Sequence, residues 1–326
     1  MASFRCLVRM WMGSPSRMSR DFSPDLESFR AASRQPRQKR HETPLGEPGR
    51  GPRRPAERTQ LRPPEVNGIR AREVPAKESR VILYDRYRGY DLRESEVHVL
   101  ADLGKFRVIA TDDLVRFAYN NDKTRMEQEI ANLTRRGLIE EREVETSFGR
   151  TSRIFALTRA GRKLLASSNR LPKGQEIYSG FVKPKEAKHD TELYRVYQRE
   201  ASRIEGRGGR VRRVVLDYEL KKKVNGDLMQ MGNEKENLGR KEEVAERYGL
   251  RVVAGRISLP DLQIEYEMTE KGVARVNLEL ATGDYRPAQI AEKARAGFTI
   301  YSHPDDGARV RRILDQQELT AEILSL

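Results

Sequence analysis

The sequence predicts a protein of mixed α and β structure, in which two folded domains follow a long basic tail. Three observations predict this fold class. Residues 14–77 are rich in Arg, Pro, Gly and Ser and poor in large apolar side chains. Residues 111–165 carry patterns of helix, helix, hairpin and helix, in that order. From residue 189 onward the patterns are those of helix, strand, strand, strand, helix and strand.

Changes in composition set the limits of these segments. The tail holds about ten of the 15 prolines and cannot bury enough apolar area to offset ordering, so we expect it to be disordered. A polar stretch that contains Pro172 and Gly174 marks the boundary between the domains. The predicted segments are a tail at 1–78, a first domain at 79–168, a linker at 169–177 and a second domain at 178–326.

Charge and cysteine content limit the function classes. The chain has 326 residues and a net charge of +14. Lysine and arginine exceed the acids by about nine in the first eighty residues, which favours a polyanionic partner such as nucleic acid. The single cysteine, Cys6, excludes an internal disulfide and a cysteine-rich zinc site, and fits the reducing cytoplasm. No apolar run approaches the roughly twenty residues that span a bilayer, so we expect no membrane partner.

The first residues leave two interpretations open. The stretch up to Arg20 contains arginines and serines but no acids, which is compatible with a mitochondrial presequence. Alternatively, the natural start is Met18. The basic tail can add non-specific phosphate contacts or serve only for solubility.

Two short helices are predicted at the start of residues 111–165. Thr111 is a suitable N-cap for the first, and two aspartates follow it, where the helix dipole favours negative charge. Asn120 and Asn121 interrupt the chain, and a second helix is expected from Lys123. Its apolar residues recur at helical spacing and leave a polar face; they are Met126, Ile130, Leu133 and Leu138.

A hairpin and a third helix follow. Strands are predicted up to Val144 and from Arg153 to Leu157, with the turn at residues 147–150, and Thr158 is expected to cap the next helix. In this order of elements, with "RRGLIE" before the hairpin and "LTRAGRKLL" after it, the chain resembles winged-helix DNA-binding domains. The resemblance implies a helix in the major groove of double-stranded DNA and a hairpin against the flanking backbone.

The resemblance also assigns roles to single residues. It makes the polar face of the second helix the face that reads bases, through Arg125, Gln128, Glu129 and Asn132. It makes four further arginines phosphate contacts, namely Arg135, Arg136, Arg150 and Arg153. The alternative is a helical unit that supports only protein contacts, with its arginines as an ordinary solvated face.

The second domain is expected to begin with a helix at 189–204, followed by the strand "RVRRVVLDYEL". A charged insertion comes next, of which residues 241–248 should be helical. Two further strands, a helix that begins at Pro287, a strand at "FTIYS" and a closing helix from Arg309 complete the order.

Two acidic residues mark neighbouring strands of this domain. Asp261 stands at the start of the second strand and Glu279 lies inside the third, so the two carboxylates can converge at one end of the sheet. This combination of element order and acids resembles PD-(D/E)XK nucleases, which have a restriction-endonuclease-like αβββαβ fold. The resemblance implies that Asp261 and Glu279 hold Mg²⁺ at the scissile phosphate and act in catalysis with a lysine.

The resemblance is incomplete, because Ala281 occupies the position of the signature lysine. Lys293 can supply the amine from the following helix, and Glu192 or Glu200 can add a third carboxylate. Without such replacements the domain binds DNA but does not cut it. The plain alternative makes Asp261 and Glu279 edge or turn acids of an ordinary sheet. Other positions considered near this site are His189, as a phosphate contact or a surface residue, and Asp284 and Tyr285, at the rim.

Residues 90–303 also resemble replication-relaxation proteins of plasmids and other mobile elements, through "HDTELYRVY", "LPDLQIEYEM" and "LELATGDYRPAQIAEKARAGFTIY". That resemblance implies a role in DNA processing or its control. The second interpretation is a Mg²⁺-dependent endonuclease or nickase, and the third is a winged-helix transcriptional regulator with a non-catalytic C-terminal domain. The expected partners are double-stranded DNA and either a second copy of the chain or a replication or conjugation protein. No P-loop is present, so an ATP-driven helicase is not supported.

Overall fold

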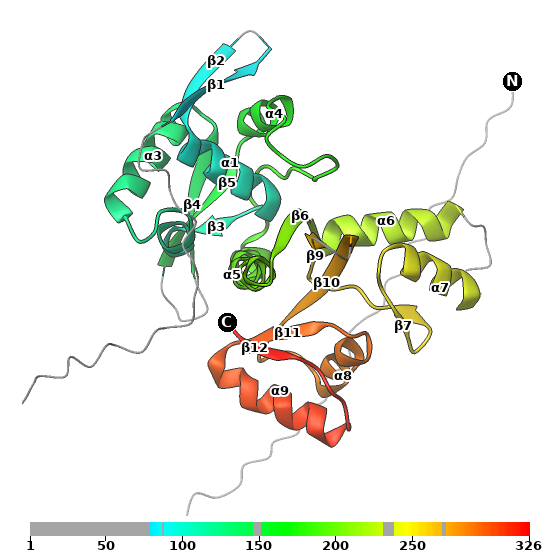
Figure 1. The fold of residues 1–326 in the computed structure, drawn as a ribbon. Helices are drawn as coiled ribbons and strands as arrows, with labels where there is room; N and C mark the ends of the chain where they lie inside the picture. Colours follow the sequence, from blue (N-terminus) through cyan, green and yellow to red (C-terminus); the bar gives the residue numbers. More distant parts are fainter. Residues whose placement is uncertain (1–78, 87, 146–150, 231–237, 269–271) are drawn as a thin grey trace, which may run out of the picture. The chain divides into compact units, whose positions relative to one another are not determined.

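The computed structural model describes residues 79–86, 88–145, 151–230, 238–268 and 272–326. Over these residues the protein is a mixed α/β structure with helices beside several sheets (Figure 1). The predicted tail and the tip of the predicted hairpin, which includes Arg150, lie outside them. Within these ranges no helix is both long and apolar enough to cross a bilayer.

The first part of the described chain contains two small sheets and several helices. Its elements in chain order are β1 (Arg80–Asp85), β2 (Arg88–Arg93), α1 (Glu94–Phe106), β3 (Ile109–Ala110), α2 (Thr111–Asp113), the π-helical turn η1 (Leu114–Ala118), α3 (Lys123–Arg135), β4 (Ile139–Glu145), β5 (Thr151–Leu157) and α4 (Arg159–Ser167). Strands β1 and β2 form an antiparallel pair, and a second sheet has the order β3-β5-β4. The order of helix, helix, hairpin and helix predicted for this stretch is therefore present.

Local signals explain where these helices begin and end. The Thr158 side chain accepts a hydrogen bond from the backbone N–H of Gly161 at 3.1 Å, which confirms the predicted N-cap. Asn120 and Asn121 have φ angles of 50° and 67°, a left-handed conformation that asparagine tolerates, and they separate η1 from α3. The prediction for Thr111 is wrong. It is the first residue of α2, and its hydroxyl donates to the Arg153 carbonyl at 3.0 Å.

The second part of the described chain forms a five-stranded sheet with helices. Its elements are α5 (Pro184–Gly206), β6 (Gly209–Leu216), α6 (Asp217–Gln230), α7 (Leu238–Arg247), β7 (Val252–Val253), β8 (Arg256–Ile257), β9 (Leu262–Met268), β10 (Gly272–Ala281), α8 (Pro287–Arg295), β11 (Thr299–Ser302), α9 (Pro304–Gln316) and β12 (Ile323–Ser325). The sheet has the order β12-β11-β10-β9-β6. Strands β6, β9 and β10 pair antiparallel, whereas β10, β11 and β12 pair in parallel.

This arrangement contains the predicted order α-β-β-β-α-β as α5, β6, β9, β10, α8 and β11. Several features differ from the prediction. Strand β6 ends at Leu216, and residues 217–220, which were expected in that strand, begin α6. The insertion after β6 begins with α6, whereas only its last part was expected to be helical. The closing helix α9 begins at Pro304 rather than at Arg309. The short strand β12 adds a parallel edge beyond β11.

Helix α5 joins the two parts through buried side chains. The described residues, which begin at Ser79, fall in one compact unit, and α5 contacts α1, β3 and β4 as well as β6, β9 and β10. Tyr194 of α5 is fully buried, its ring centroid lies 5.2 Å from that of Phe106, and its hydroxyl donates to Asp102 at 3.0 Å. One cluster of buried apolar residues therefore runs from the first part of the chain into the five-stranded sheet.

Candidate functional site

Asp261 and Glu279 lie opposite each other at one end of the five-stranded sheet. Strands β9 and β10 pair with Leu262 opposite Leu278, so the next residue outward on each strand is one of the two acids. The backbone N–H of Asp261 donates to Glu279 Oε2 at 3.2 Å, and the N–H of Leu280 donates to Asp261 Oδ2 at 2.9 Å. Each carboxylate is thus held by the backbone of the other strand.

Helix α8 brings an amine to this pair. Lys293 Nζ lies 2.9 Å from Glu279 Oε1 and donates to the Leu259 carbonyl at 2.5 Å. The connection from β10 through α8 to β11 joins parallel strands, so α8 lies against the sheet and can direct a side chain to the end of β10. Ala281, at the position of the signature lysine, is buried in the apolar cluster that includes Ile290 of α8. The structure therefore brings together the three residues predicted as catalytic.

Two further side chains complete the cluster. The Tyr285 hydroxyl donates to Glu279 Oε1 at 2.9 Å, so this residue lies inside the cluster and not only at its rim. His189 Nε2, on α5, lies 3.5 Å from Asp261 Oδ1, with about a third of its side chain exposed. His189 precedes the strands of the sheet and Tyr285 follows β10. Their positions in the sequence do not show whether their side chains reach the carboxylates. Only the packing of α5 and of the loop after β10 brings them to the carboxylates.

The electrostatics of the cluster depend on burial. Burial raises the pKa of Glu279 to about 7, and the charge of Asp261 adds to this effect, whereas Lys293 and Tyr285 oppose it. Burial lowers the pKa of His189, but its hydrogen bond to Asp261 and neighbouring carboxylates outweigh this effect, so that the pKa is about 9. Near neutral pH, His189 is therefore charged and Glu279 is partly protonated.

Glu192 and Glu200, the candidates for a third carboxylate, contact other groups. Glu192 is buried and lies 3.2 Å from His303 Nε2, and its charge also helps to raise the pKa of His189. Glu200 accepts from the Tyr301 hydroxyl at 2.7 Å and from Arg203 at 2.8 Å. Among the described residues, no group of three or more acidic, histidine or cysteine side chains is arranged to hold a metal ion. The candidate site is built on the pair Asp261 and Glu279.

The two carboxylates fit Mg²⁺ in the chemistry of their donor atoms. Mg²⁺ takes oxygen ligands and is commonly bound through one or two carboxylates, with water and substrate phosphate as the remaining ligands. Asp261 and Glu279 provide such oxygens, and burial together with the charge of Asp261 raises the pKa of Glu279. Glu279 Oε1 accepts from Lys293 and Tyr285 and Oε2 from the Asp261 N–H, so a metal ion would bind at the remaining lone pair of Oε2 or displace one of these donors.

The predicted DNA-reading residues of α3 lie in different environments. Glu129 is 1 % exposed and pairs with Arg93 at 3.3 Å and with Arg125 at 2.9 Å. The expectation that Glu129 faces a groove is therefore wrong, because α3 packs this carboxylate against α1 and β2. Asn132 donates to Glu96 of α1 at 2.5 Å. Glu129 and Asn132 therefore attach α3 to β2 and to α1, and Arg125 pairs with Glu129 within α3.

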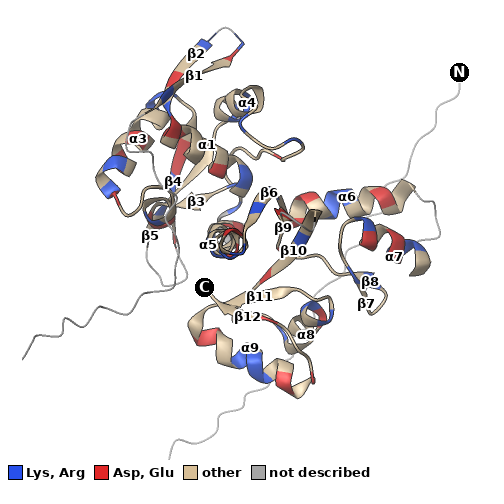
Figure 2. Ribbon diagram, in the orientation of Figure 1, with Lys and Arg blue, Asp and Glu red and all other residues tan. Residues whose placement is uncertain are grey.

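The remaining candidates lie nearer to the surface. Gln128 and Arg135 are exposed on α3, a helix that carries both basic and acidic residues (Figure 2). Arg136 is half-buried and donates to Asn132 at 3.2 Å. Arg153 pairs with Glu127 and lies 3.8 Å from Glu141. Among the described arginines that were predicted to contact phosphate, only Arg135 is exposed.

The geometry thus defines a buried carboxylate–lysine cluster at the end of a mixed sheet, in a chain whose first part has the order helix, helix, hairpin and helix. No protein-family model matches the chain, and it matches no curated protein and no solved structure. The chemistry of the cluster therefore carries the functional argument.

Proposed function

We propose that this protein processes DNA: its winged-helix-like part binds a duplex, and the cluster around Asp261 hydrolyses a phosphodiester bond with Mg²⁺. The proposal includes membership of the replication-relaxation proteins and a role on a plasmid or other mobile element. One observation carries it. Two carboxylates on paired strands meet a lysine amine within hydrogen-bond distance at the end of the sheet.

The residues of the cluster divide the chemistry among them. Asp261 and Glu279 would hold Mg²⁺, which, when bound, supplies Lewis-acid stabilisation of the negative charge on the phosphate. Lys293 supports proton transfer from the attacking water, because its amine is partly buried and fixed by the Leu259 carbonyl. His189, charged below about pH 9, offers a donor to a phosphate oxygen from its exposed side.

A plasmid-nicking assay tests this proposal. We expect the full chain to convert supercoiled plasmid to the nicked form with Mg²⁺ and to be inactive with a chelator. Asp261→Asn keeps an oxygen that can accept from the Leu280 N–H but removes the charge. It should lower the rate by about 100-fold or more, because the metal contributes several kcal/mol of transition-state stabilisation.

Asp315→Asn is the matched control, since Asp315 is exposed near the end of α9. This variant should nick at the wild-type rate. Circular dichroism should give the same folded spectrum for both variants. Nicking that persists in Asp261→Asn would contradict the catalytic role of the cluster.

The second candidate function is a DNA-binding regulator whose cluster serves structure. A specific observation favours it, because Lys293, Tyr285 and the Asp261 N–H already occupy both oxygens of Glu279. In that case the chain binds duplex DNA, the cluster stabilises the sheet, and no divalent cation restores cleavage. Binding of a labelled duplex without nicking at any Mg²⁺ or Mn²⁺ concentration would select this function.

A further inference from the structure

A pocket of about 260 Å³ lies beside α6, outside the carboxylate–lysine cluster. It is formed by α6, by the end of α7 and by the segment that precedes α5. Three tyrosines, three acids and two lysines dominate its lining: Tyr178, Tyr218, Tyr248, Glu176, Glu219, Asp227, Lys222 and Lys223. Its size suits one small ligand with a flat ring.

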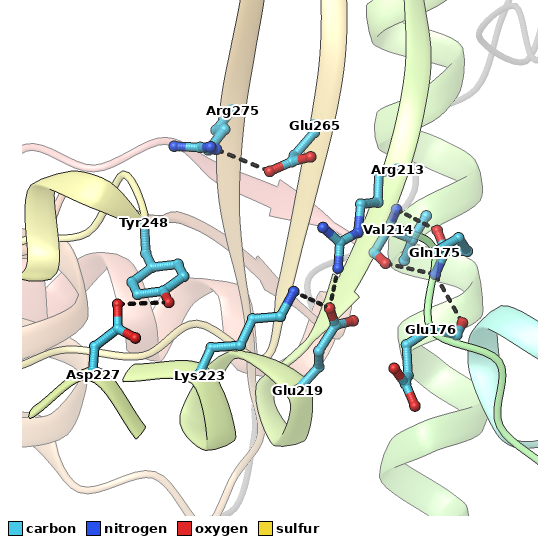
Figure 3. Close-up of polar contacts among 10 residues, drawn as sticks. All are labelled: Gln175, Glu176, Arg213, Val214, Glu219, Lys223, Asp227, Tyr248, Glu265 and Arg275. Carbon is cyan, nitrogen blue, oxygen red and sulfur yellow. Dashed lines mark hydrogen bonds and ion pairs between the residues drawn. The ribbon is translucent and has the colours of Figure 1, made fainter. Parts of the chain in front are cut away.

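Glu219 is 5 % exposed and has one oxygen without a partner. Oε1 accepts from Lys223 at 2.6 Å and from Arg213, as Figure 3 shows. Oε2 has no hydrogen-bond partner among the described residues, although it is almost fully shielded from solvent. The Tyr178 hydroxyl is in the same condition. Unpartnered buried polar atoms are unfavourable, so a ligand that supplies their hydrogen bonds binds with a gain in free energy.

The aromatic side chains provide ring faces at this pocket. The Tyr248 hydroxyl donates to Asp227 Oδ2 at 2.9 Å, an interaction that fixes the orientation of its ring (Figure 3). Tyr218 is 63 % exposed, which is unusual for a large apolar ring and leaves it free to stack on a ligand. Aromatic side chains stack on nucleobases regardless of sequence, because every base has a π face.

The charges argue against a cationic ligand. The lining carries three carboxylates, Glu176, Glu219 and Asp227, and two lysines. Glu219 is already paired with Arg213 and Lys223, and Asp227 is paired with Arg247, while Lys222 adds a further positive charge. A ligand cation would meet these like charges. A neutral ring that carries a phosphate avoids this repulsion, since the lysines can contact the phosphate while the ring lies among the tyrosines.

We propose that this pocket binds one unstacked nucleotide whose base carries an exocyclic amine, as adenine, cytosine and guanine do. In each of these bases the amine can donate to Glu219 Oε2, next to a ring nitrogen that can accept from the Tyr178 hydroxyl. Thymine has no exocyclic amine and presents carbonyl oxygens, which the carboxylate repels. The inference rests on the proposed DNA function, for which it supplies a second contact that reads a displaced base.

Calorimetric titration of the full chain with deoxynucleoside monophosphates tests the pocket. The experiment is done with a chelator and without duplex DNA, so it does not depend on nicking. We expect saturable binding of dAMP, dCMP and dGMP, and at least about tenfold weaker binding of dTMP. Tyr218→Ala should weaken dAMP binding by about tenfold or more through the loss of stacking. Tyr178→Phe, which removes only the hydroxyl, should weaken it by roughly fivefold.

Tyr84→Ala is the matched control, because Tyr84 on β1 is 60 % exposed and distant in sequence from the pocket. It should leave dAMP binding unchanged. Absence of saturable dAMP binding overturns the pocket, and so does equal dAMP affinity of wild type and Tyr218→Ala. Equal affinity for dTMP overturns the assignment of the base. Nucleotide binding without nicking refutes only the proposed catalysis, and nicking without nucleotide binding refutes only this pocket.

Discussion

At the scale of single residues, Glu279 shows how position and burial together create an unusual carboxylate. It is 1 % exposed and lies beside Asp261, so its charged form has lost water and gained a like-charged neighbour. The Lys293 amine and the Tyr285 hydroxyl compensate for only part of this loss. The protonation state of the Glu279 carboxyl therefore changes near neutral pH.

This property predicts the pH dependence of stability. The pKa of Glu279 is raised to about 7 in the folded state, so the folded chain binds this proton more tightly than the unfolded chain. The stabilisation is fully present below the unfolded pKa, near 4.5, and is lost as pH rises through about 7. Glu279→Gln does not titrate. With a chelator present, the free energy of unfolding of the variant relative to wild type should increase by roughly 3 kcal/mol between pH 4.5 and 8.

Urea unfolding at several pH values measures this difference. Glu246→Gln is the control, because Glu246 is an exposed glutamate on α7. Its unfolding free energy should follow that of wild type at every pH. Parallel curves for Glu279→Gln and wild type would show that the buried carboxyl has an ordinary pKa.

At the scale of elements, the periodicity and order of residues in the sequence predict helices and strands better than they predict side-chain contacts. The strand pairing that brings Asp261 opposite Glu279 follows from the predicted hairpin, and Lys293 follows from the helix after it. Helix α6 was missed, because Asn225 and Gly226 are poor helix formers and the stretch reads as a charged insertion. Its buried residues Leu220 and Val224 pack with α7 in a separate small core.

The contacts of the polar face of α3 with the rest of the protein could not be predicted from the sequence pattern. Polarity normally indicates solvent, but Glu129 and Asn132 are polar residues that contact β2 and α1. A sequence does not show which partner a carboxylate has. Gln175 is a similar case: its amide both donates to and accepts from the backbone of Val214, at 2.8 and 2.9 Å, and so covers the edge of β6 (Figure 3).

The proposed binding of a duplex can be tested on the exposed side of α3. Arg135→Ala, together with Gln128→Ala, should weaken binding of a labelled duplex and reduce the slope of log Kd against log salt by about one, since one phosphate contact is lost. Arg125→Ala should lower the unfolding free energy instead, because its guanidinium pairs with the buried Glu129. Anisotropy at several salt concentrations separates the two outcomes. An unchanged slope in the double variant would mean that α3 does not contact the DNA backbone.

At the scale of the whole molecule, α5 determines whether the two predicted domains act as one. Whether residues 79–168 and 178–326 unfold as two separate domains or as one cooperative unit remains a prediction. Tyr194 is buried against Phe106, and Arg195 Nε donates to the buried Asp113 of α2 at 2.6 Å. These contacts couple the helix that begins the second predicted domain to the first. Any force or ligand that displaces α5 therefore affects the residues around Asp261, because His189 lies on the same helix.

This coupling predicts a single cooperative transition. Tyr194→Ala removes a fully buried ring and the hydroxyl that donates to Asp102, which should destabilise the chain by about 3–5 kcal/mol. If residues 79–326 unfold as one unit, the slowest-exchanging amides of α3 and of β10 lose the same amount of protection in this variant. Hydrogen exchange measured by mass spectrometry compares the two elements directly, with Tyr84→Ala as the exposed control. Loss of protection in α3 alone would contradict cooperative unfolding. It would mean that α5 stabilises the first part of the chain but does not couple the stability of that part to the stability of the five-stranded sheet.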